Sequence, residues 1–67
     1  MKFSLTAQID EIDRELALRR DVYPRLVATK KLRESHAKYQ MDRLLAVRAT
    51  LVWLSENESI IKQRLSP

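Results

Sequence analysis

The residues of this chain that could do chemistry are few, and they form no catalytic pattern. Cysteine is absent, so neither a disulfide nor a thiolate metal site can form. The single histidine, His36, has no carboxylates at helical ligand spacing beside it, and we expect it to be exposed near a turn. There is no serine, histidine and acid set and no glycine-rich phosphate loop. We therefore expect no enzyme, no bound metal and no cofactor.

Four carboxylates lie close together near the start of the chain: Asp10, Glu11, Asp13 and Glu15. They could be taken for a cation site. Carboxylates are more often a solvated face in the early turns of a helix, where they favour the positive end of the helix dipole. Asp10 with Arg14 and Glu15 with Arg19 also have the spacing of stabilising pairs on one helix. We expect a solvated helix face here.

A basic cluster occupies the middle of the chain and consists of Arg19, Arg20, Arg25, Lys30, Lys31, Arg33 and Lys38. Only Asp21 and Glu34 oppose it, and Tyr23 and Tyr39 are rings on which bases could stack. Phosphate neutralisation with base stacking would make this cluster a nucleic-acid contact. The competing interpretation is a solvated tip that keeps the protein soluble, and the net charge of +4 fits both.

The segment 44–54 must organise the structure around these residues, because it is apolar on nearly all sides. Its only charged residue is Arg48. A helix that packs against one neighbour needs an apolar stripe only about 100° wide. Here one stripe of leucine and valine has further apolar residues on both flanks, including Trp53. We therefore expect this segment to contact more than one partner.

Two heptad stripes predict two helices. The first helix has Ser4 or Thr6 as its N-cap, and its stripe is Leu5, Ile9, Ile12, Leu16, Arg19, Tyr23 and Leu26. The second begins near Arg33, and its stripe is Ala37, Gln40, Leu44, Val47, Leu51, Leu54, Glu58, Ile61 and Leu65. Ser55 and Glu58 fit a capping box, which predicts a break after Leu54 and a short terminal helix.

Pro24 leaves two alternatives for the first helix, which either stops near Asp21 or kinks and continues. The stripe keeps its phase through Leu26, so we expect a kink at Pro24 and a continuing helix. The phase changes over residues 29–33, where we place the reversal of the chain.

This reversal sets a register between the two helices. It places Arg19 opposite Asp42 and Arg48 opposite Asp13, so that each charge in an apolar stripe meets an opposite charge. The second helix also extends beyond the first, which would leave Ile60, Ile61 and Leu65 in water.

The segment ELALRRDVYPRLVATKKL, followed by Ala37, Met41, Leu44 and the pair Thr50–Leu51, resembles small uncharacterised helical proteins encoded by bacteriophages and prophages of proteobacteria. The resemblance covers about the middle two-thirds of the chain. Members of that group often have glycine where this chain has Lys30, a position that suits a left-handed helix cap. The resemblance implies a phage or prophage origin and assigns no activity.

We expect an all-α protein of one domain, residues 1–67, folded as an antiparallel two-helix hairpin that assembles into a dimeric four-helix bundle. The predicted oligomer interface is Leu44, Val47, Leu51, Trp53, Leu54, Ile60 and Ile61. The expected function is that of a phage accessory protein that binds itself and a host or phage protein, and the alternative is nucleic-acid binding by the basic cluster. No apolar run reaches the roughly 18 residues of a membrane span, and no signal peptide is visible. We expect no membrane partner and a location in the cytoplasm of the host cell.

Overall fold

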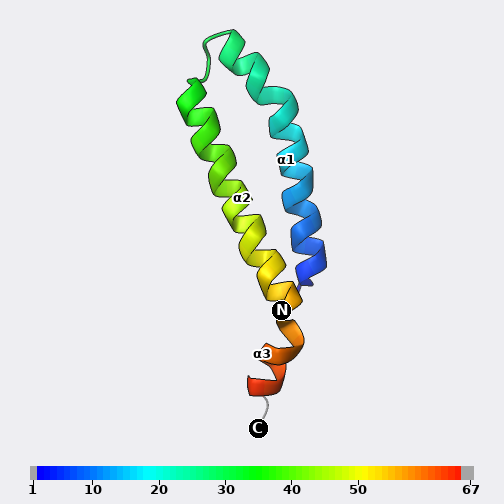
Figure 1. The fold of residues 1–67 in the computed structure, drawn as a ribbon. Helices are drawn as coiled ribbons and strands as arrows, with labels where there is room; N and C mark the ends of the chain where they lie inside the picture. Colours follow the sequence, from blue (N-terminus) through cyan, green and yellow to red (C-terminus); the bar gives the residue numbers. More distant parts are fainter. Residues whose placement is uncertain (1, 66–67) are drawn as a thin grey trace.

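The computed structural model describes residues 2–65, and all regular structure within that range is helical. Two long helices, α1 (Leu5–Ala28) and α2 (Glu34–Glu56), lie side by side and antiparallel, and a short helix, α3 (Glu58–Leu65), follows α2 (Figure 1). The Cα atoms span 56 × 18 × 15 Å, so the molecule is a narrow rod. The all-helical hairpin with a short third helix is confirmed.

The start of α1 is capped by Ser4. The backbone N–H of Ala7 donates a hydrogen bond to Ser4 Oγ at 3.1 Å, which satisfies one of the free amides of the first turn. Ser4, and not Thr6, is therefore the N-cap.

Pro24 lies inside α1 and does not end it. The prediction that the helix passes this proline is confirmed, and the alternative of a helix that stops near Asp21 is wrong. Because proline has no N–H, the carbonyl of Arg20 receives no helical hydrogen bond from position 24. The predicted kink at Pro24 stays a prediction.

The chain reverses over residues 29–33, as predicted. The N–H of Lys31 donates to the carbonyl of Leu26 at 2.9 Å, and the N–H of Lys30 donates to the carbonyl of Val27 at 3.0 Å. These two bonds are those of a Schellman motif, whose key residue is left-handed and usually glycine. Lys30 has that role here, with φ at 61°.

The face of α1 that packs against α2 is the one that the heptad pattern predicts. Every member of the predicted stripe is buried or half-buried: Leu5, Ile9, Ile12, Leu16, Arg19, Tyr23 and Leu26. Leu16 is the most completely buried residue of this stripe, with 3% of its surface exposed. Alternating spacings of three and four residues therefore identified the correct face.

The predicted phase of α2 is partly wrong. Gln40 and Val47 are exposed, and Met41 and Arg48 take the half-buried positions in their place. The inward stripe, again at spacings of four and three, is Ala37, Met41, Leu44, Arg48, Leu51 and Ser55. Arg48 can occupy it because Asp13 of α1 binds its guanidinium. The pairing of Arg48 with Asp13 was predicted, but the stripe was given Val47 at this position and not Arg48.

The break between α2 and α3 lies at Asn57, so the predicted break after Leu54 with a Ser55–Glu58 capping box is wrong. The side-chain amide of Asn57 donates to the carbonyl of Trp53 at 2.8 Å. The N–H of Ile61 donates to the carbonyl of Asn57 at 2.9 Å, so the helical direction is nearly preserved across the break.

Helix α3 extends past the beginning of α1, as Figure 1 shows. The predicted overhang is therefore confirmed. Ile60 and Leu65 have 51% and 79% of their surfaces exposed. The prediction is wrong for Ile61, which is half-buried and lines a small hollow together with Leu5 and Leu54.

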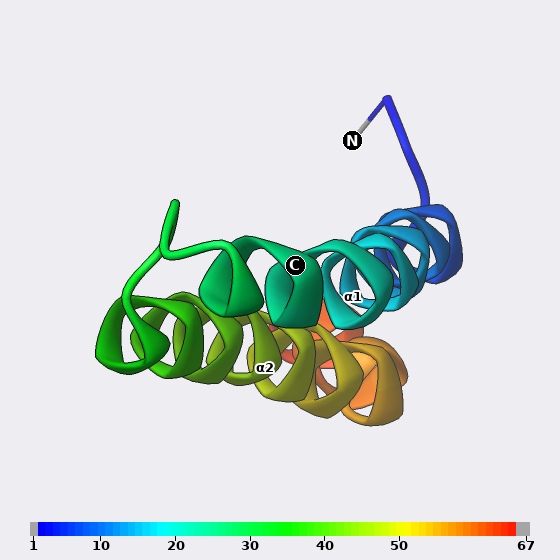
Figure 2. The ribbon, with the colours of Figure 1, turned by 90° about the horizontal axis from the view of Figure 1, so that it is seen from above.

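The hydrophobic core of the hairpin is very small. Of residues 2–65, only Leu5, Leu16 and Ala37 are buried apolar residues. Viewed from the tip, α1 and α2 form a single pair, and no third helix of the described chain covers its outer faces (Figure 2). Within the same range, no helix is long and apolar enough to cross a membrane.

Candidate functional site

The two long helices are joined by an ion pair of Asp13 with Arg48. Arg48 Nε lies 2.6 Å from Asp13 Oδ1, and Arg48 Nη2 lies 3.5 Å from Asp13 Oδ2. The hydrogen bond from Arg48 holds the pKa of Asp13 below its ordinary value, and the charges of Arg48 and Arg20 lower it further. The same bond raises the pKa of Arg48. This pair confirms the predicted register.

The second predicted pair, Arg19 with Asp42, does not form. Arg19 Nε donates to Glu15 Oε1 at 2.8 Å, and its Nη1 donates to the carbonyl of Gln40 at 3.3 Å. Lys38 Nζ lies 2.6 Å from Asp42 Oδ2. Each group has an opposite charge one turn away on its own helix, where little side-chain freedom is lost in pairing. Local partners therefore replaced the pair across the hairpin.

The basic cluster is divided by its ion pairs. Arg19, Arg25 and Lys38 each bind a carboxylate one turn away, with Arg25 Nη2 at 2.6 Å from Asp21 Oδ2. The members without an ion pair among the described residues are Arg20, Lys30, Lys31 and Arg33.

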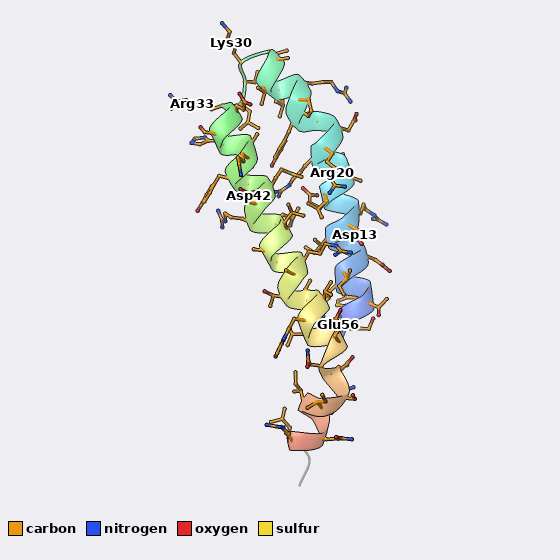
Figure 3. All side chains as sticks on the ribbon, viewed as in Figure 1. Asp13, Arg20, Lys30, Arg33, Asp42 and Glu56 are labelled. Carbon is orange, nitrogen blue, oxygen red and sulfur yellow. The ribbon has the colours of Figure 1, made fainter. Side chains whose placement is uncertain are left out.

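Three of these unpaired residues belong to the turn between α1 and α2, and we call Lys30, Lys31 and Arg33 the turn cations. All three are exposed. Lys30 and Arg33 point away from the hairpin at its tip, whereas Arg20 lies farther down α1 (Figure 3). The structure therefore places three unpaired charges, and not all seven predicted ones, at the tip.

The two tyrosines near the basic cluster differ in whether their rings are accessible for stacking against a nucleic-acid base. The hydroxyl of Tyr23 donates to Gln40 Oε1 at 2.7 Å, and its ring lies half-buried beneath Arg19. Tyr39 has 60% of its surface exposed, and the guanidinium of Arg43 lies 5.4 Å from its ring centre. Only Tyr39 offers an exposed ring face, and Arg43 already occupies one side of it.

The predicted oligomer interface is divided between two faces. Leu44, Leu51, Leu54 and Ile61 are half-buried on the side toward α1. Val47, Trp53 and Ile60 are exposed, with 47%, 57% and 51% of their surfaces in contact with water. Trp53 and Ile60 are seven residues apart and so lie on the same side of the helical path, whereas Val47 lies on another side.

Three of the four acidic residues near the start of α1 form ion pairs with arginine. The predicted pair of Asp10 with Arg14 is wrong, because Arg14 binds Glu11 instead. Glu11, Asp13 and Glu15 pair with Arg14, Arg48 and Arg19 respectively. Among residues 2–65, no group of three or more histidine, cysteine or acidic side chains could hold a metal ion. This arrangement agrees with a solvated helix face.

A hollow of about 580 Å³ lies between α1 and α2 toward the tip, with Pro24, Val27 and Met41 in its lining. It is open and mostly apolar. No polar or charged residue of the described chain is buried.

These surfaces must be interpreted without relatives. Comparisons with family models, curated proteins and solved structures found no match to this chain. The resemblance to phage proteins therefore stays a prediction.

Proposed function

We propose that this chain is a small accessory protein, of phage or prophage origin, that acts by binding proteins and not by catalysis. Its first partner is a second copy of itself, with which it forms a dimeric four-helix bundle. The observation that carries this proposal is the imbalance between a core of three buried apolar residues within residues 2–65 and the large exposed apolar side chains of α2 and α3.

The size of the core supports the need for a partner. Domains of this length without disulfides or metals have little stability to spare, and fixing each residue costs about 1–2 kcal/mol of conformational entropy. Among the apolar residues that the structure describes, burial of Leu5, Leu16 and Ala37 alone offsets a small part of that cost. Full burial of an exposed isoleucine contributes about 1.5–3 kcal/mol, and Ile60 has 51% of its surface exposed, so covering it would add about half of that.

Sedimentation equilibrium of the full chain at micromolar concentration tests this proposal. The monomer mass is 7.9 kDa, and we expect at least twice that value. A helical species of monomer mass under these conditions would refute self-association. The exposed apolar surface would then be left for a different protein.

A second candidate function is nucleic-acid binding at the tip, and the turn cations are the observation that favours it. Lys30, Lys31 and Arg33 are exposed and have no ion pair in the described structure. Phosphates could therefore reach them without displacing a carboxylate.

The triple substitution Lys30→Gln, Lys31→Gln and Arg33→Gln tests this candidate. If the tip binds phosphates, affinity for random duplex DNA should fall, and the slope of log affinity against log salt should flatten by roughly 2–3, because each lost phosphate contact contributes about 0.9. Fluorescence anisotropy at several salt concentrations measures both.

The control for this test makes the same charge change elsewhere, with Lys2, Arg14 and Arg64 replaced by glutamine. All three are exposed and lie outside the turn. Equal salt slopes for the two triple variants would exclude the tip as the binding site.

A further inference from the structure

Helix α2 carries a second heptad stripe on the face opposite α1, and the repeat continues to Ile60 of α3. Tyr39, Ala46, Ala49, Trp53 and Ile60 follow one another at spacings of seven, three, four and seven residues, and all five are exposed. Asp42 and Glu56 complete the repeat, and both are exposed as well. We call these seven positions the outer stripe. Its positions follow those of the inward stripe, such as Ala37 and Leu44, by two residues. Two residues correspond to a rotation of about 200° around the helix axis.

The centre of the outer stripe is shaped for another helix. Ala46 and Ala49 lie one turn apart with no side chain beyond Cβ, so a second helix can approach closely there. Trp53, one turn farther along, projects a large ring beside that shallow region. Leu45 and Val52 widen the apolar band on one flank. Small residues beside a large one are the arrangement from which knobs-into-holes packing is built.

We infer that the outer stripe binds the outer stripe of a second copy of this chain, in antiparallel orientation about a two-fold axis near Ala46 and Ala49. The inference rests on the proposed self-association and specifies which face and which direction it uses. In this arrangement Ala46 packs against the partner's Ala49, and symmetry repeats the contact.

The charges along α2 select the antiparallel orientation. Asp42 and Glu56 occupy equivalent positions toward opposite ends of the helix (Figure 3). A parallel, in-register dimer would place each of these carboxylates against its own copy, and like charges across an interface destabilise it. The antiparallel dimer separates each carboxylate from its own copy.

The same orientation brings opposite charges together. Glu56 and Arg43 have no ion pair within residues 2–65. Arg43 lies over Tyr39, at one end of the outer stripe. In the antiparallel dimer, the partner's Glu56 lies at this same end. Lys38 stands at that end too, beside Asp42. A surface that is self-complementary in this way fits a second copy of the chain.

The first test replaces Ala49 by glutamate and measures the mass by sedimentation equilibrium. A charge at the centre of the outer stripe should raise the dimer dissociation constant by at least about 100-fold, since it would be buried without a partner. The matched control is Ala17→Glu, the same change at an exposed alanine of α1, which should leave the constant within about threefold of the parent.

The second test measures orientation and does not depend on a disruptive variant. Because the chain has no cysteine, a nitroxide can be attached at Ser35→Cys alone, at the exposed start of α2. In the antiparallel dimer the two labels lie roughly 35–40 Å apart at 1.5 Å per residue, whereas a parallel dimer places them within about 15 Å. Pulsed electron–electron double resonance measures this distance.

The outcomes separate the inference from the function on which it rests. Dissociation of the Ala49→Glu variant, an intact Ala17→Glu dimer and a long label distance support both. A parent dimer that tolerates Ala49→Glu, or that shows the short label distance, overturns the outer-stripe inference and leaves self-association standing. A monomeric parent refutes both proposals.

Discussion

Lys30 has a strained backbone conformation in the turn. It is the only described residue other than glycine with a positive φ, and that angle is required for the two hydrogen bonds that close α1. For a residue with a Cβ, this conformation costs about 1 kcal/mol or more, because the Cβ approaches the neighbouring carbonyl. Glycine has no Cβ and adopts this conformation without that steric cost.

We therefore expect Lys30→Gly to stabilise the protein by about 1 kcal/mol. Urea unfolding followed by circular dichroism at fixed protein concentration measures this change. Lys31→Gly is the matched control, since Lys31 has no positive φ and glycine there only loosens the unfolded chain. A Lys30→Gly variant no more stable than the Lys31→Gly variant would contradict this account of the turn.

The ion pair of Asp13 with Arg48 should make the stability of the protein depend on pH. The hydrogen bond from Arg48 lowers the pKa of Asp13 in the folded protein. A lowered folded pKa means that the carboxylate stabilises the fold above its unfolded pKa of about 3.9, and that this contribution is lost as the pH falls through the folded value.

Asp13→Asn should accordingly destabilise the protein slightly at pH 7, and the difference from the parent should shrink below about pH 4. Thermal unfolding at several pH values measures it. Asp10→Asn is the control, because Asp10 has no ion pair among residues 2–65. A constant difference between the Asp13→Asn variant and its parent from pH 7 to pH 3 would remove the proposed role of the ion pair.

At the scale of the helices, sequence patterns predicted α1 well and α2 less well. The α1 stripe stands out because its neighbours are charged, so one face of the helix is clearly the apolar one. The segment 44–54 is apolar on most sides, so several phases fit it equally. Burial in the structure selected the phase that contains Met41 and Arg48, and nothing in the apolar pattern alone distinguishes it from the one with Gln40 and Val47.

The outer stripe was missed for a related reason. Its repeat from Tyr39 to Ile60 is visible in the sequence, but alanine at its centre carries a weak hydrophobic signal and two positions are acidic. Larger apolar residues elsewhere on α2 dominated the prediction. Exposure of all seven positions in the folded hairpin is what makes the repeat significant.

For the whole molecule, the turn position, the register and the overhang of α3 could all be predicted from the order of charges and breaks in phase. The ion pair of Arg48 with Asp13 was among these predictions because both residues interrupt or flank apolar stripes. The spacing of Glu15 and Arg19 on one helix predicted the ion pair that they form, but the register also offered Arg19 the carboxylate of Asp42 across the hairpin. Only side-chain geometry decides between these two acids.

The central claim is that one hairpin is incomplete and that a second copy stabilises it. The most direct measurement is the thermal midpoint of unfolding, followed by circular dichroism over a 100-fold range of protein concentration. Because dissociation accompanies unfolding of an obligate dimer, mass action should raise the midpoint steadily with concentration. A midpoint that stays the same across the whole range, with full helicity at the lowest concentration, would contradict the claim.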